Sequence, residues 1–186
     1  MSVVYKLIWA VRYICYKLIF GSCKGIGYLG RPLFLHNPRN IHLSNRVRIF
    51  PNSRMETHRG GKLTICEGVS IGQGLHITSQ DFNLTIGKGT IMSGNVVITN
   101  IDHEYQDITA PVDAQPLMSK DTQVGENCFI GYGSFIQAGT KLGKHCVVGA
   151  NSVVSGKYED YSVLVGAPAK VVKRYCFEHK RWIKIP

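Results

Sequence analysis

Residues 124–159 read VGENCF, IGYGSF, IQAGTK, LGKHCV, VGANSV and VSGKYE when the chain is divided into groups of six. Each group begins with an aliphatic residue, and most have glycine next to it and a small residue at the fifth position. A helix would need apolar residues three and four apart, which this spacing does not provide. The pattern predicts short parallel strands joined by tight turns, with the first residue inward and the fifth at a corner.

The same frame returns upstream of this stretch, in residues 43–54, 65–76 and 86–103. Cys128 and Cys146 are eighteen residues apart, and both occupy a fifth position. They would therefore stack directly in a solenoid with three hexads per turn. Because each coil hydrogen-bonds to the next, several coils are needed before an interior exists. The repeat covers roughly residues 41–168 and predicts a parallel β-helix.

The pattern of aliphatic residue, glycine and small fifth residue resembles that of the hexapeptide-repeat acyltransferases. The resemblance implies a left-handed β-helix, an exception to right-handed crossovers, and a homotrimer with active sites between neighbouring subunits. We predict an all-β fold in four parts. These are an amphipathic helical segment (1–24), a left-handed parallel β-helix (25–168) with a protruding loop excursion (104–123), and a short basic C-terminal extension (169–186), which we expect to be helical.

The balance of charge is basic, with 22 Lys and Arg against 12 Asp and Glu and a net charge of +10. Such an excess suits nucleic acid, a membrane surface or a polyanionic nucleotide cofactor. Nucleic acid fits least, because the chain has no recognised binding motif and its basic residues gather near both ends. The six cysteines form no C-x-x-C pair and no zinc-like group with histidine. We predict no metal and a reduced, cytoplasmic protein.

The stretch ITNIDHEY (98–105) stands where the repeat breaks off, and the frame returns only near Val124. By itself, a histidine beside such a loop is either a catalytic base or a solvated surface residue. The stretch resembles the T-x-x-x-H segment of galactoside, maltose and polysaccharide O-acetyltransferases, which implies that His103 is the general base. An alcohol needs such a base to attack a thioester at neutral pH, and imidazole is the suitable side chain. Asp102 is a candidate for orienting the ring.

Two further residues are assigned to the acceptor by alignment with the same enzymes. Asp81 falls where they have an acidic residue that contacts a sugar hydroxyl, and Gln73 falls where they have an asparagine. A carboxylate can accept hydrogen bonds from two hydroxyls. The alternative for Asp81 is an ordinary loop aspartate in SQDFN.

The stretch GAPAKVVKR (166–174) resembles the signature that closes acetyl-CoA-dependent hexapeptide enzymes. Its cations suit the phosphates of coenzyme A. A solvated basic tail would explain the charges but not the Gly-x-Pro-Ala beside them. The resemblance implies that Phe129 is the apolar wall for the pantetheine arm, and that small residues let the arm lie close. The predicted cofactor contacts are Phe129, Gly131, Ala150, Ser155, Lys157, Lys170, Lys173 and Arg174.

The first twenty residues differ from the rest of the chain. On a helical wheel an apolar face opposes cations and tyrosines; the apolar residues are Val4, Leu7, Val11, Ile14, Cys15 and Leu18. A spanning helix would have to bury three cations, which is costly. The segment is therefore predicted either to lie in a membrane interface, as a peripheral contact at the inner face, or to pack against the trimer.

These observations predict an acetyl-CoA-dependent O-acetyltransferase for a sugar hydroxyl in surface polysaccharide biosynthesis, acting on a sugar or a lipid-linked saccharide. The alternatives are an acetyltransferase that inactivates a small hydroxylated compound of antibiotic type, and a non-catalytic β-helix scaffold. A scaffold would need neither His103 nor the GAPAKVVK stretch.

Overall fold

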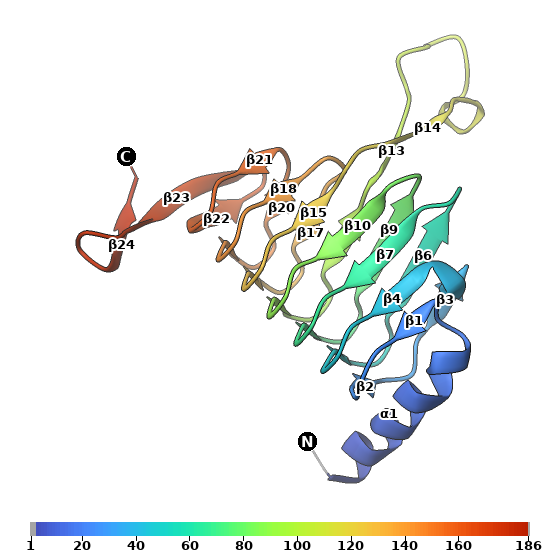
Figure 1. Cartoon of the computed structure of the whole chain (residues 1–186). Helices are drawn as coiled ribbons and strands as arrows, with labels where there is room; N and C mark the ends of the chain where they lie inside the picture. The colour runs from blue at the N-terminus through green and yellow to red at the C-terminus, as the bar shows by residue number, and fades with distance from the viewer. Residues whose placement is uncertain (1–2, 186) are drawn as a thin grey trace.

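A computed structural model describes residues 3–185 and shows a solenoid of short parallel strands in three sheets (Figure 1). Each coil contributes one strand to each sheet in turn, so that neighbouring strands in a sheet are one coil apart. The fold is a left-handed parallel β-helix: the hexads predicted the parallel β-helix, and the family resemblance implied its hand.

We name the three sheets A, B and C in the order in which the chain reaches them. Sheet A contains β1 (Ser22–Cys23), β4 (Ile41–Leu43), β7 (Lys62–Ile65), β10 (Asn83–Ile86), β15 (Gln123–Val124), β18 (Lys141–Leu142) and β21 (Lys157–Tyr158). Sheet B contains β2 (Tyr28–Leu29), β5 (Arg48–Ile49), β8 (Ser70–Ile71), β11 (Ile91–Met92), β16 (Phe129–Ile130), β19 (Val147–Val148) and β22 (Ser162–Gly166), followed by two antiparallel strands of the C-terminal segment. Sheet C contains β3 (Phe34–His36), β6 (Arg54–His58), β9 (His76–Gln80), β12 (Val97–Thr99), β17 (Phe135–Ile136) and β20 (Val153–Val154). A 3₁₀ turn, η2 (Pro38–Asn40), links β3 to β4.

The length of a coil differs before and after the loop. Phe129 pairs with Val147, eighteen residues on, as three hexads per turn require. Upstream, Arg48 pairs with Ser70, twenty-two residues on. The hexad frame is therefore strict after the loop and interrupted by extra corner residues before it.

The interior is built as the repeat predicted. The first residues of the hexads, such as Ile130, Ile136 and Val148, are fully buried. Fifth residues fill the corners, where the Ser134 hydroxyl donates to a backbone carbonyl of the next coil at 2.9 Å. Cys128 and Cys146 are also buried at this position, directly before the paired residues of β16 and β19. All six cysteines are free thiols.

Helix α1 (Val3–Cys15) and the short η1 (Tyr16–Leu18) close the N-terminal end of the solenoid (Figure 1). The helix packs on the first coil through its aromatic residues, because Trp9 and Tyr13 are buried and the Tyr13 hydroxyl bonds to the carbonyl of Ser44 at 2.9 Å. The aliphatic face predicted from the helical wheel points outward instead. Among residues 3–185 there is no helix with the length and apolar character needed to cross a bilayer.

The loop projects from the side of the solenoid on a two-stranded antiparallel stem (Figure 1). The stem consists of β13 (Ile101–His103) and β14 (Leu117–Ser119), and the loop between them contains η3 (Val112–Ala114). The chain therefore leaves the coil at Asn100 rather than after His103, where the sequence placed the break. The hexad frame had assigned residues 101–103 to a coil, but their backbone pairs with β14 in the stem instead.

The expectation of a helical C-terminal extension is wrong. Residues 169–184 form a β-hairpin of β23 (Ala169–Cys176) and β24 (Arg181–Lys184), and β23 extends sheet B antiparallel to β22. The edge of β22 offers unpaired backbone groups, and the alternating AKVVKRYC sequence with its β-branched valines suits a strand. An aromatic cluster holds the hairpin, with the rings of Tyr175 and Trp182 5.5 Å apart.

Candidate active site

His103 is the last residue of β13 and lies opposite Leu117 of β14. Its side chain is exposed. Within the described part of the chain, no hydrogen bond or ion pair engages the imidazole ring, and His103 is held through its backbone, whose N–H donates to Asp102. The stem thus fixes the position of the ring while leaving both ring nitrogens available to a substrate.

Asp102 faces away from the imidazole ring, as expected of adjacent residues on a strand. Its Oδ1 accepts the backbone N–H of His103 at 3.0 Å, and its Oδ2 lies 3.3 Å from Lys120 Nζ. The carboxylate therefore supports the stem, and within one chain it does not orient the ring. Glu104 also turns back on the backbone, accepting from the N–H groups of Tyr105 and Gln106 at 3.1 Å.

A network of polar side chains anchors the loop stem to the coil beneath it. The buried Asn100 exchanges two hydrogen bonds with the backbone of Gln80, at 2.7 and 2.9 Å. The Gln80 amide donates to Ser119 at 3.0 Å and to Asp81 at 3.3 Å, and Ser119 donates to Asp81 at 2.7 Å. The stem, and His103 with it, is therefore held to sheet C by four side chains.

The structure separates the two residues predicted to contact the acceptor. Asp81 follows β9 and belongs to the network at the loop stem. Gln73 is exposed on the turn before β9, at the opposite end of the same strand. Within one chain only Asp81 is therefore near the loop stem. Sequence reasoning missed Gln80, Asn100 and Ser119, because their roles depend on pairings across twenty and thirty-nine residues.

A second polar cluster lies on the outer face of sheet C, and sequence reasoning missed it as well. Glu56 is only 8% exposed and forms ion pairs with Arg54, with His58 at 3.4 Å and with His76 at 3.5 Å. Burial alone would raise the pKa of Glu56, but the hydrogen bonds and charges of Arg54 and His58 hold it below its ordinary value. Since His58 pairs with Gln80, this cluster adjoins the loop stem.

The predicted contacts to the pantetheine arm gather at the corner between sheets B and C. Phe129 is exposed on β16, between Ile91 and Val147 of the neighbouring strands. Gly131 follows it, and a Cβ there would lie 2.5 Å from the backbone nitrogen of Ala150. Only glycine lets these two coils approach so closely.

The remaining predicted contacts to the cofactor lie at other places on the chain. Ser155 follows β20 at the corner between sheets C and A, and Lys157 begins β21. Lys170 and Lys173 lie on β23, which borders sheet B. Arg174, on the same strand, is already ion-paired with Glu159.

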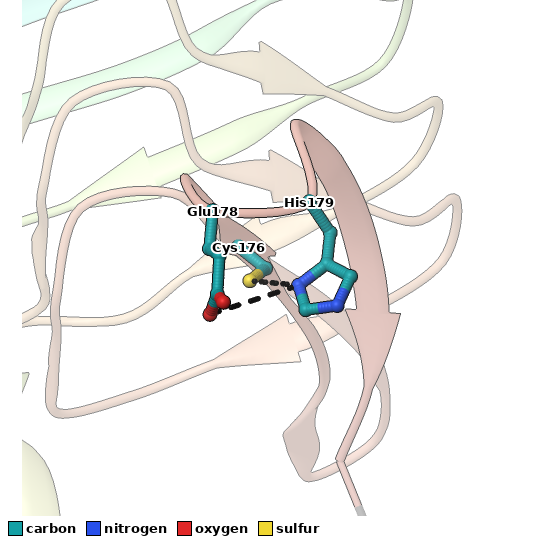
Figure 2. A group of neighbouring side chains, drawn as sticks. All are labelled: Cys176, Glu178 and His179. Carbon is teal, nitrogen blue, oxygen red and sulfur yellow. Dashed lines mark hydrogen bonds and ion pairs between the residues drawn. The ribbon is translucent and has the colours of Figure 1, made fainter.

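The described residues contain one group of three side chains with the spacing of metal ligands, Cys176, Glu178 and His179 (Figure 2). The thiol lies 3.3 Å from His179 Nδ1, and the Glu178 carboxylate lies 3.9 Å from the same nitrogen. Hydrogen bonds from the backbone and ring of His179 lower the pKa of the Cys176 thiol. The donors suit a borderline-soft cation such as Zn²⁺, but they sit on the turn of the C-terminal hairpin, and none belongs to the loop stem.

Comparisons with known proteins agree with the fold. Residues 121–156 match the family model described as bacterial transferase hexapeptide (six repeats). The chain carries the transferase hexapeptide repeat. Its resemblance to the hexapeptide-repeat acyltransferases, predicted from the hexads, is confirmed.

Two relatives align with most of this hexapeptide-repeat chain. The "Probable acetyltransferase Rv3034c" of Mycobacterium tuberculosis is 31% identical over 81% of the chain, and the chain spans 50% of that protein. The "Putative lipopolysaccharide biosynthesis O-acetyl transferase WbbJ" of Escherichia coli is 28% identical over 90% of the chain and 87% of its own length. The chain therefore spans about half of one relative and most of the other.

Solved structures share the fold of the hexapeptide-repeat chain. A mutant of AntD, an N-acyltransferase from Bacillus cereus in complex with dTDP-4-amino-4,6-dideoxyglucose and coenzyme A, superposes with a TM-score of 0.76. The match covers 90% of this chain and 91% of that one at 18% identity. At this identity the likeness concerns the fold.

Proposed function

We propose that the chain is an acetyl-CoA-dependent O-acetyltransferase that acts on a sugar hydroxyl, with His103 as the general base. The observation that carries the proposal is the environment of His103. Its ring is exposed and unengaged, while the stem that bears it is tied down by the Asn100, Gln80, Asp81 and Ser119 network. A base must be positioned firmly and remain available to the substrate, and both conditions are met here.

The reaction requires only direct transfer between two bound substrates. An imidazole nitrogen of His103 takes the proton of a sugar hydroxyl as the oxygen attacks the thioester carbonyl carbon. The tetrahedral intermediate then expels the thiolate of coenzyme A, and the imidazolium returns the proton to the sulfur. No serine or cysteine needs to carry the acetyl group.

The donor is assigned to coenzyme A because the chain offers suitable groups for each part of it. Phe129 and the glycine at 131 provide an apolar and closely approachable surface for the pantetheine arm. Lys170 and Lys173 provide cations for the phosphates, whereas Arg174 is occupied by Glu159. The AntD structure with coenzyme A supports this assignment through its shared fold.

The separation of the two half-sites supports a homotrimer. His103 and Ser155 belong to the corner between sheets C and A, whereas Phe129 lies on sheet B and Ala150 at the corner between sheets B and C. One chain alone therefore presents base and donor surface at different corners. Threefold packing would bring one corner of a subunit against the other corner of its neighbour and complete the site.

The acceptor is assigned to a sugar because polar side chains surround the stem. Asp81, together with His76 at the start of the preceding strand and Glu56 one coil below, offers hydrogen-bond partners for several hydroxyls. The name of the E. coli relative supports a place in surface polysaccharide biosynthesis. The acceptor would then be a sugar or a lipid-linked saccharide.

The decisive experiment measures thiol release from acetyl-CoA against a panel of sugars, sugar nucleotides, amino-sugar nucleotides and chloramphenicol-like alcohols. We expect acceptor-dependent release by the wild type and a loss of about 10²–10⁴-fold in His103→Ala. His42→Ala is the matched control, because His42 lies on sheet A, away from the loop stem, and its ring bonds to Ser22. Its rate should stay near the wild-type value.

The binding of coenzyme A, measured by calorimetry, separates catalysis from folding. His103→Ala should bind coenzyme A as the wild type does. Equal turnover of His103→Ala and wild type on a good acceptor would refute the role of the base. Activity confined to amino sugars would replace O-acetylation with N-acetylation, and activity confined to the drug-like alcohols would favour detoxification. A failure to bind coenzyme A at all would favour the scaffold.

A further inference from the structure

Helix α1 and the turn after it carry two apolar stripes on opposite sides. Trp9, Tyr13 and Phe20 point inward and are at most 8% exposed. A second stripe of four aliphatic side chains is shifted by two residues, which turns it about 200° around the helix. Its members are 53–78% exposed; we call Leu7, Val11, Ile14 and Leu18 the outer stripe.

The outer stripe is not needed for packing within the chain. A surface helix normally turns its one apolar stripe to the core and a polar face to water. Here the aromatic stripe already fills the end of the solenoid, where Tyr13 bonds to the carbonyls of Lys24 and Ser44. The outer stripe is therefore left exposed on α1 and the turn after it.

The charge around this surface has one sign. Residues 1–55 contain nine Lys and Arg and no Asp or Glu, and Glu56 is the first acidic residue of the chain. Lys6 and Lys17 are exposed and border the outer stripe on one side. Two copies of such a surface would repel each other, whereas an anionic surface would be attracted.

A cavity of about 630 Å³ opens beside the helix. Its lining joins apolar and cationic groups: Ala10 of the helix, Ile26 and Tyr28 of the first coil, and Arg46 and Arg48 of the second. Arg46 is ion-paired with Glu67 at 2.8 Å, while Arg48 has no ion pair among residues 3–185. A second cavity of about 170 Å³ adds Lys6 and Trp9 to the same groove. Such a lining suits a phosphate group attached to an apolar chain.

We propose that the N-terminal end of the solenoid docks on an anionic lipid bilayer. The outer stripe of α1 enters the boundary between headgroups and acyl chains, and Lys6, Lys17 and Arg48 meet the lipid phosphates. The helix lies in the plane of the interface, since it is too short to span the bilayer. This inference concerns where the protein works and does not rest on the proposed reaction.

The test uses the full-length protein and flotation with vesicles of phosphatidylcholine alone or with about one third phosphatidylglycerol. Wild type should float with the anionic vesicles, and Leu7→Glu/Ile14→Glu should reduce the partition coefficient at least tenfold. The matched control, Ile183→Glu/Ile185→Glu, places two glutamates on exposed aliphatic positions of the C-terminal hairpin. It should float like the wild type.

Light scattering and circular dichroism on the same samples separate the possible outcomes. The proposal requires that Leu7→Glu/Ile14→Glu keep the fold and the oligomeric state of the wild type. It is overturned if the wild type does not float with anionic vesicles, or if both double variants float equally well. It is also overturned if the helix variant dissociates the oligomer, since a second copy of the chain would then cover the stripe.

Discussion

The coils before the loop and those after it share one fold but differ in their outer surfaces. After the loop, coils of eighteen residues repeat without insertion, and their corners are filled by small buried residues such as Ser134 and Cys146. Before it, coils of up to twenty-two residues carry ionised and polar clusters such as Glu56 with His58 and His76. The regular coils after the loop provide rigidity and close contact between coils, whereas the irregular coils before it provide ionisable and polar side chains. His103 stands at the boundary between them.

The largest expected effect is at this boundary. Asn100→Ala removes two buried hydrogen bonds and leaves the N–H and C=O groups of Gln80 unpaired, at a cost of about 2–4 kcal/mol in the free energy of unfolding. Denaturant titration would measure it. Because the stem loosens with the network, the Michaelis constant for the acceptor should also rise while the dissociation constant of coenzyme A stays unchanged.

Asn83→Ala is the control, since Asn83 makes exposed hydrogen bonds on sheet A. Its effect on unfolding should be below about 0.5 kcal/mol. If Asn100→Ala weakened the binding of coenzyme A as strongly as the binding of the acceptor, the coils before and after the loop would not serve separate binding roles.

A smaller effect is expected from two glycines that share a left-handed backbone but not their surroundings. Gly133 has φ +68°, and a Cβ there would lie 2.3 Å from Asn151 Oδ1 in the stacked corner. Gly60 has φ +77° on an open turn with nothing within 4 Å. Gly60→Ala should cost about 1 kcal/mol from the backbone alone, and Gly133→Ala about 1–2 kcal/mol, because the Asn151 amide must also move aside. Equal losses in thermal unfolding would show that the regular corners are no tighter than the irregular turns.

The smallest expected effect is the acid dependence of the cluster on sheet C. The folded pKa of Glu56 lies below its ordinary value of 4.5, so its ionised form stabilises the fold above that pH, and this stabilisation is lost as the pH falls through the folded pKa. Glu56→Gln should therefore be less stable than the wild type at pH 7, and the difference should shrink below about pH 4.5. Glu126→Gln, an exposed residue without an ion pair among residues 3–185, should track the wild type throughout. If the difference in stability between Glu56→Gln and the wild type stayed constant from pH 7 to pH 3, the stabilising role of ionised Glu56 would be contradicted.

The β-helix could be predicted because a single local rule repeats along it. Aliphatic first positions and small fifth positions foretell both the interior and the stacking of Cys128 on Cys146. The C-terminal hairpin could not be predicted in the same way. Its strand state depends on the open edge of β22, which exists only after the solenoid has formed.

The candidate site was predictable only in part for a similar reason. His103 is conspicuous because the repeat breaks beside it, but Asn100, Gln80 and Ser119 have no local signal. These three residues meet because of the lengths of the coils before the loop, and those lengths vary from coil to coil. The wheel also identified the aliphatic face of α1 correctly, yet it could not tell which stripe the solenoid would bury, since it grouped Tyr13 with the cations of the opposite face.

The stem of the loop has a consequence for how such a protein can change over generations. Val97 of β12 pairs directly with Phe135 of β17, as though the intervening excursion did not exist. Residues 104–116 can therefore lengthen, shorten or be exchanged without shifting the register of any coil, and doubling a loop costs only about 0.6 kcal/mol in chain entropy. Preference for one substrate over another can drift in this segment while the stack that folds the protein stays as it is.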